Sequence, residues 1–163
     1  MRSSRIPVSF VLSLLWVIST NAAPVKGVVI DPGGAAVSGC RVTAYALEGT
    51  EAQVLRYESD KPDRKSLASA TSNAAGEFSI DVPAERVFQL QFEAEKFAPA
   101  ATPVANGEDI GAVLLTPAPT KVGSLRAKGK PVAGARVIYI GAAEMITVTD
   151  TEGKFRVADP GLW

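Results

Sequence analysis

The chain has 163 residues, and its 17 lysines and arginines are balanced by 17 aspartates and glutamates. This balance gives no electrostatic case for binding to nucleic acid or to an anionic membrane. The chain contains no histidine, which excludes Ser-His-Asp catalysis, Cys-His catalysis and His-ligated zinc within it. Because no S-x-x-K or G-x-S-x-G motif occurs either, we expect no enzymatic activity and no cofactor. The single cysteine, Cys40, cannot form an internal disulfide and is expected to be buried and inert.

Residues 1–22 have the pattern of a secretory signal peptide. Arg2 and Arg5 precede an apolar run over residues 6–18, and the small residues of STNAA follow it. This order of charged, apolar and small segments is typical of a cleavable signal, and we predict cleavage after Ala22. The apolar run is shorter than the roughly 20 residues that span a bilayer. We therefore expect a secreted, periplasmic or cell-surface protein, with no membrane insertion after cleavage.

From residue 25 onward, apolar and polar residues alternate in short segments that Gly, Pro, Asn and Asp separate, which indicates strands rather than helices. In one such segment, Phe78, Ile80 and Val82 alternate with polar neighbours. Each strand then has one buried and one solvated face, so two sheets are expected to pack face to face. The strands predicted for this first unit are residues 25–30, 40–46, 67–72, 77–82, 87–94 and 110–117.

The phrase TSNAAGEFSI, at residues 71–80, returns as VTDTEGKFRV at residues 148–157. Gly supplies a positive φ, and Asn or Asp binds the backbone of its own turn, so the phrase is predicted to close a β-hairpin in each of two similar units. The repeat extends backwards: GCRVTAY (39–45) matches GARVIYI (134–140), and VKGVVI (25–30) matches KVGSLR (121–126). The first unit is longer by an 18-residue insertion that falls within residues 47–66.

The segment TPAPT, at residues 116–120, is rich in proline and is predicted to be a linker without structure. It separates a first unit, residues 24–117, from a second unit, residues 118–163. The second unit stops before the counterparts of residues 87–115, so we expect a partial repeat at the start of a larger protein.

The order of a D-x-x-G loop, V-x-G-[AC]-x-V, N/D-x-x-G-x-F-x-[IV] and KFAP resembles the carboxypeptidase regulatory-like domain. The resemblance covers nearly all of residues 24–117 and the first half of a second copy. It implies an all-β fold, a seven-stranded Greek-key β-sandwich of the transthyretin type, followed by a truncated second sandwich. The related B-type repeat of pilins forms a Lys–Asn isopeptide bond, which is not expected here because Val29 and Phe92 occupy the positions of its Lys and Glu.

The tyrosines are the candidate contacts for a ligand or partner. Tyr45 and Tyr139 are predicted to hold matching outward positions, and Tyr57 lies in the insertion. Exposed aromatic rings stack on sugars or anchor protein partners. The alternative is that these rings pack against a neighbouring strand or unit.

Three carboxylates, Glu58, Asp60 and Asp63, lie close together in the insertion. They could form a weak calcium site, because calcium takes several oxygen ligands. Lysines and an arginine intervene, so a solvated loop is the favoured interpretation, and no metal is expected.

These patterns predict a non-catalytic, extracytoplasmic β-sandwich that serves as a spacer or interaction domain in a larger secreted or cell-envelope protein. Its expected partners are protein domains or a surface glycan. Two alternatives stay open. One is a carbohydrate-binding module, which needs a paired aromatic platform. The other, suggested by the family resemblance, is an accessory domain of a secreted peptidase or an outer-membrane receptor.

Overall fold

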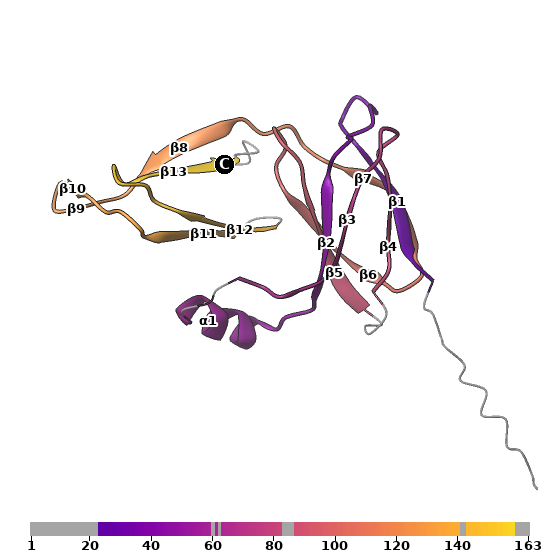
Figure 1. The fold of residues 1–163 in the computed structure, drawn as a ribbon, viewed down its shortest axis with the longest axis horizontal. Coiled ribbons are helices and arrows are strands. Elements are labelled where there is room, and N and C mark those ends of the chain that lie inside the picture. Colours follow the sequence, from indigo (N-terminus) through magenta and orange to yellow (C-terminus); the bar gives the residue numbers. More distant parts are fainter. Residues whose placement is uncertain (1–22, 60, 62, 83–86, 141–142, 159–163) are drawn as a thin grey trace, which may run out of the picture.

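The computed structural model describes residues 23–59, 61, 63–82, 87–140 and 143–158, and the predicted signal peptide lies outside them. These residues form two β-units in chain order (Figure 1). The first unit comprises β1 (Val25–Ile30), β2 (Arg41–Ala46), α1 (Thr50–Glu58), β3 (Ser66–Thr71), β4 (Glu77–Ile80), β5 (Val87–Glu93), β6 (Ala100–Ala105) and β7 (Asp109–Leu114). The second comprises β8 (Thr120–Ser124), β9 (Arg126–Ala127), β10 (Lys130–Pro131), β11 (Arg136–Ile140), β12 (Glu144–Val148) and β13 (Lys154–Ala158). Across the described ranges, no helix is long and apolar enough to cross a membrane.

The first unit is a sandwich of two sheets, which confirms the predicted all-β, seven-stranded architecture. One sheet has the order β4-β1-β7, and the other has the order β3-β2-β5-β6. All neighbouring strands are antiparallel except β1 and β7, which are parallel. Alternation in the sequence therefore identifies strands in both sheets, because such strands turn their apolar side toward the other sheet.

The core lies between these two sheets. The rings of Phe78, from β4, and Phe92, from β5, pack edge to face with their centroids 5.5 Å apart. Cys40 is buried as predicted, and burial raises the pKa of its thiol to about 11, so the reactive thiolate is suppressed. The buried core residues are Val25, Val29, Val37, Cys40, Val42, Ala44, Phe78, Ile80, Val82, Phe88, Leu90, Phe92, Val104 and Leu115.

The repeated phrase does not close a β-hairpin, and that prediction is wrong. β3 pairs with β2, whereas β4 pairs with β1 in the opposite sheet, so the turn between them crosses from one sheet to the other. The Asn73 Oδ1 accepts hydrogen bonds from the backbone N–H groups of Ala75 and Glu77. The carbonyl of Gly76 accepts another from the N–H of Val29, at 2.8 Å. This last bond docks the turn on β1 and directs β4 into that sheet.

The same crossing turn, with equivalent hydrogen bonds, occurs in the second unit. The Asp150 Oδ1 accepts from the N–H groups of Glu152 and Lys154, at 2.9 and 2.8 Å. The Gly153 carbonyl accepts from the N–H of Leu125, at 2.7 Å. β13 accordingly pairs with β8, while β12 pairs with β11. The sequence repeat is therefore a structural repeat.

Three further differences from the sequence predictions concern segments without strong alternation. The insertion forms α1, and Ala100–Ala105 forms β6, which had been missed. The segment 116–120 is not an unstructured linker. Its Ala118 is buried and donates its N–H to the Lys96 carbonyl at 2.8 Å, Pro117 bridges to Phe97, and Thr120 begins β8.

Candidate functional site

Helix α1 projects from the first unit beneath the second one (Figure 1). None of its residues is buried, so the apolar core does not hold it in place. Its end is defined by Ser59, whose hydroxyl and N–H both donate to the Arg56 carbonyl, at 2.7 and 3.1 Å. The helix therefore ends with the side chains of Arg56 and Tyr57 beside the second unit.

Arg56 binds two carboxylates, one from each unit. Its Nε and Nη2 donate to Glu48, at 2.9 and 2.8 Å. Its Nη1 and Nη2 donate to Glu144 of β12, at 2.9 and 2.7 Å. The side chains of Arg56 and Glu144 are only 11 % and 12 % exposed. The Arg56–Glu144 ion pair is bidentate and shielded from water, and such charge-assisted pairs have the stronger hydrogen bonds found in proteins.

Tyr57 contributes a further bond to the same carboxylate. Its hydroxyl donates to the Glu144 Oε2 at 2.6 Å and accepts from the Gln53 amide at 2.9 Å. We refer to Glu48, Arg56, Tyr57 and Glu144 together as the inter-unit clamp.

The clamp shifts the pKa values of its members. Burial alone would raise the pKa of Glu144, but hydrogen bonds from Arg56 and Tyr57 outweigh it and leave that pKa below its ordinary value of 4.5. The pKa of Arg56 is raised by its bonds to Glu144 and then to Glu48. Burial and the bond to Glu144 raise the pKa of Tyr57. At neutral pH Glu144 is therefore a carboxylate, Arg56 a guanidinium and Tyr57 a neutral phenol.

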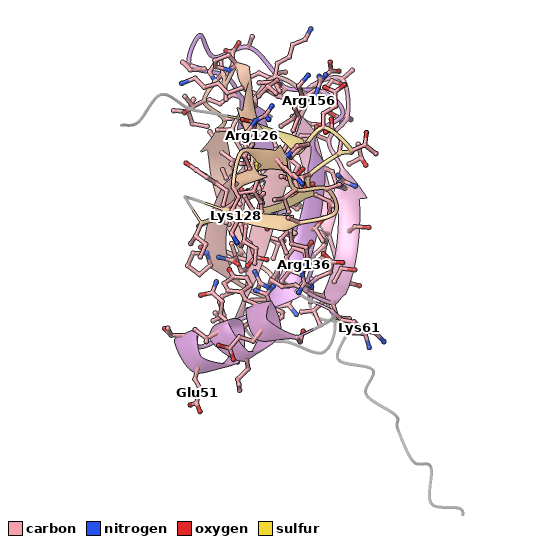
Figure 2. All side chains as sticks on the ribbon, turned by 90° about the vertical axis from the view of Figure 1, so that its left-hand side faces the viewer. Glu51, Lys61, Arg126, Lys128, Arg136 and Arg156 are labelled. Atoms are coloured by element: carbon pink, nitrogen blue, oxygen red, sulfur yellow. The ribbon has the colours of Figure 1, made fainter. Side chains whose placement is uncertain are left out.

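Side-chain hydrogen bonds to backbone carbonyls also join the units around the clamp. The Gln91 side-chain amide of β5 donates to the Glu144 carbonyl at 3.1 Å. Arg136 of β11 donates to the Ser59 carbonyl at 2.9 Å. Figure 2 shows Arg136 near α1 and Arg156 toward the other end of the second unit.

A cavity of about 410 Å³ lies beside the clamp, between the outer face of β2 and β5 and the strands β12 and β13. Its lining is mainly polar. Arg64 crosses one side, with its guanidinium 4.6 Å from the centre of the Tyr45 ring and its Nη2 donating to the Ala46 carbonyl at 2.6 Å. The lining residues are Tyr45, Asp63, Arg64, Gln91, Glu93, Glu144, Met145, Ile146, Thr147, Arg156, Val157 and Ala158.

The three tyrosines do not share one surface. Tyr45 lines this cavity beneath Arg64, and Tyr57 lies in the clamp, 4.7 Å from the Arg56 guanidinium. Tyr139 does not occupy the position that matches Tyr45, so that prediction is wrong. In the first unit Ala44 pairs with Ala68, and at the equivalent place in the second unit Tyr139 pairs with Met145. Tyr139 is therefore the counterpart of Ala44, which faces inward. Contact of any of the three with a ligand stays a prediction.

Of the three candidate calcium carboxylates, the structure describes Glu58 and Asp63. Glu58 ends α1 and Asp63 lines the cavity, while Asp60 lies outside the described residues. In the described part of the chain, no group of three or more His, Cys, Asp or Glu side chains is arranged to hold a metal ion.

Sequence reasoning missed the two charged residues that matter most here, Arg56 and Glu144. A signal for the helix was present, because TEAQVLRYE contains no Gly or Pro and is rich in helix formers. Arg56 and Glu144 are 88 residues apart, so no local sequence pattern indicates that they pair.

No protein-family profile matches the chain. A search of curated proteins likewise gives no match. Solved structures that are similar in part include a Streptococcal ancillary pilin (12% identity, TM-score 0.37), an (S)-allantoin synthase (15%, 0.35) and the Bacillus anthracis TIE protein (11%, 0.37). The matches cover 85%, 60% and 85% of this chain, and 50%, 42% and 26% of those chains. The chain thus spans half or less of the proteins that it resembles, and similarity at this level does not identify a function.

Proposed function

We propose that the chain is a non-catalytic spacer module that works outside the cytoplasm and holds two β-units at a fixed mutual orientation. The observation that carries this proposal is the clamp, in which Arg56 of the first unit binds Glu144 of the second through two short hydrogen bonds. A spacer needs such a junction, because a flexible joint would not set the direction of the units that follow it.

The geometry of the clamp favours a stiff junction. A planar guanidinium that binds a carboxylate with two bonds fixes both distance and angle. Gln91 binds the backbone carbonyl of Glu144, and Arg136 binds that of Ser59, so rotation about the Arg56–Glu144 side-chain pair would break these bonds. Removing one partner of a buried ion pair costs about 3 to 5 kcal/mol. The clamp is partly open to water, because the Glu48 side chain is 21 % exposed. We therefore expect the loss of the Glu144 carboxylate to weaken the docking of the second unit by about 1 to 3 kcal/mol.

The proposed location of the module, and its place in a larger protein, are inferred from the sequence. The pattern of residues 1–22 supports export, and the resemblance to carboxypeptidase regulatory-like domains supports a place in a larger secreted or cell-envelope protein. An accessory role beside a peptidase or a receptor is compatible with the same spacer. A glycan platform of Tyr45 and Tyr57 is less favoured, because an arginine lies against each ring.

The proposal is tested by the distance between the units. Spin labels on Ser38→Cys and Ala133→Cys would report it in the full chain, since buried Cys40 does not react. We expect a narrow distance distribution in the parent and a broad one after Glu144→Ala.

The matched control is Glu152→Ala. Glu152 also pairs with a basic residue, Lys154, but its side chain is 67 % exposed and the pair lies within the second unit. The control should keep the narrow distribution. A Glu144→Ala protein as narrow as its parent would show that the clamp does not set the orientation.

A further inference from the structure

The cavity beside the clamp has two unlike walls. The first unit contributes polar side chains, among them Arg64 and Gln91, from the outer face of its sheet and from the segment before β3. The second unit contributes an apolar wall, which consists of Met145, Ile146, Val157 and Ala158. A cavity of this kind, at a junction between two units and with a few polar groups beside an apolar surface, is typical of a site for a small ligand.

Strands that lie outermost in this fold bound the cavity on its second-unit side. Residues 144–147 of β12 and 156–158 of β13 line it without a break, and since successive side chains point to opposite faces, each strand presents its edge. These strands correspond to β3 and β4, which are the outer strands of their sheets in the first unit. The cavity therefore does not depend on what pairs with β8 or β11.

Gln91 presents an oriented hydrogen-bond acceptor to this cavity. The residue is only 6 % exposed, and its amide nitrogen donates to the Glu93 Oε1 at 2.9 Å and to the Glu144 carbonyl at 3.1 Å. In the described part of the chain, the Gln91 Oε1 accepts no hydrogen bond. A largely buried amide oxygen favours a donor, so the site suits a ligand that carries an N–H group.

Two guanidinium groups line the cavity without a carboxylate partner. Arg64 lies against the Tyr45 ring and donates to neutral groups, the Gln89 amide oxygen and the Ala46 carbonyl. These bonds use two of its five N–H groups. Arg156 is exposed on β13 and makes no hydrogen bond or ion pair within the described residues. Each unit therefore contributes one guanidinium that can bind an anion.

The carboxylates that line the cavity leave these guanidiniums available. Glu93 is bound by Arg41 at 2.8 Å. Glu144 is bound by Arg56 at 2.7 Å, and neither arginine lines the cavity. The third carboxylate, Asp63, is exposed and forms no ion pair among the described residues. The charged groups left to meet a ligand are two guanidiniums and one carboxylate, which favours a ligand with a negative charge.

We propose that this cavity binds an N-acylated amino acid that has a free α-carboxylate and an apolar side chain. Arg64 and Arg156 bind the carboxylate, because a guanidinium matches a carboxylate with two parallel hydrogen bonds. The acylated N–H donates to the Gln91 Oε1, and the apolar side chain packs on the apolar wall. This inference goes beyond the spacer role and rests on the docked arrangement of the two units, since each unit supplies one of the arginines.

N-acetyl-leucine is the probe for the full chain, and N-acetyl-leucinamide is the matched control because it lacks the negative charge. The acid should bind with roughly millimolar affinity, as a molecule of this size with few contacts does, and should shift the NMR signals of the amides of residues 144–147 and 156–158. The amide should bind roughly tenfold more weakly or not at all, since hydrogen bonds between charged groups are the stronger ones.

Two further probes define the ligand. N-acetyl-N-methyl-leucine cannot donate to the Gln91 Oε1 and should bind more weakly than N-acetyl-leucine. Acetyl-glycyl-glycyl-leucine carries the same terminal group at the end of a peptide. If it binds as well as N-acetyl-leucine or better, the site accepts the C-terminal residue of a peptide, and if it binds more weakly, the site is built for the small molecule.

Variants of the chain locate the site. Arg156→Gln should weaken binding of N-acetyl-leucine by roughly tenfold or more. Arg126→Gln is the matched control, because it removes the same charge from β9, at the end of the second unit that lies away from the first (Figure 1). It should bind as the parent does. The distance between labels on Ser38→Cys and Ala133→Cys shows whether the units stay docked in each variant.

The outcomes separate this inference from the spacer role. A parent with a narrow distance distribution that binds no N-acetyl-leucine at any soluble concentration would overturn the inference and leave the spacer role intact. Equal binding of the acid and its amide, or of N-acetyl-leucine by the parent and Arg156→Gln, would also overturn it. A broad distribution in the parent would contradict both, because the two walls of the cavity would no longer face each other.

Discussion

At the scale of single residues, the repeat places the same side chain in two different environments. Phe78 and Phe155 hold the same position in the repeated phrase, and each faces a glycine across its sheet. Phe78 is covered by Phe92, whereas Phe155 is only half-buried. Their contributions to stability should therefore differ, although the local sequences are alike.

We predict that Phe78→Ala lowers the free energy of unfolding of the first unit by about 3 to 5 kcal/mol, the usual loss for a buried phenylalanine. Phe155→Ala should lower that of the second unit by less than half as much, because less apolar area is lost to water. Urea unfolding, followed by circular dichroism and by hydrogen exchange of each unit, measures both. Equal losses would mean that Phe155 is as well covered as Phe78.

At the scale of the elements, the crossing turn is the part that both units share most closely. Gly76 and Gly153 have φ of 76° and 72°. A Cβ on Gly76 would lie 2.4 Å from the Val29 carbonyl oxygen, and one on Gly153 would lie 2.5 Å from that of Leu125. The turn therefore needs glycine for its backbone conformation and also for its contact with the first strand of its unit.

We predict that Gly76→Ala is more damaging than positive φ alone would make it. The matched control is Gly39→Ala, because Gly39 has φ of 74° and nothing within 4 Å of its Cβ position. Gly39→Ala should cost about 1 to 2 kcal/mol, the strain of a left-handed residue. Gly76→Ala should cost clearly more in the same thermal unfolding experiment, since the turn must also leave β1. Similar costs would show that this contact can relax.

The sequence predicted those strands and turns whose structure depends on neighbouring residues in the chain. Alternation located β1 to β5 and β7 because each strand has one apolar face, but β6 contains Pro103 and small residues and gave no signal. The crossing turn was mistaken for a hairpin because Asn73 and Gly76 specify a reversal of the chain and not the partners of its two strands. Which sheet receives β4 depends on β1, far away in sequence.

The candidate site was less predictable for the same reason. Helix α1 has 9 residues, too few to be stable alone, and it is held by contacts with Glu48 and Glu144 that only the folded chain brings together. Tyr57 was identified as a contact residue, but its bond is to the other unit. Tyr139 was misplaced by one position, and one position in a strand reverses the face.

At the scale of the whole molecule, the two units are joined through an ionised group, so their docking should depend on pH. Hydrogen bonds from Arg56 and Tyr57 hold the pKa of Glu144 below its ordinary value of 4.5 in the docked state, against the opposing effect of burial. The undocked state therefore binds a proton more readily than the docked one. Docking keeps its full strength above pH 4.5 and weakens as the pH falls through the lower, docked pKa.

We predict that the narrow distance distribution between labels on Ser38→Cys and Ala133→Cys persists from pH 7 to about pH 5, the region above the ordinary carboxylate pKa. It should broaden on further acidification, before the first unit loses its circular dichroism signal. The described core residues of that unit include no titratable group apart from the Cys40 thiol, which stays protonated in acid. Glu144→Ala should be broad at every pH. Broadening that begins near pH 6.5, or that coincides with unfolding of the first unit, would show that protonation of Glu144 does not release the second unit.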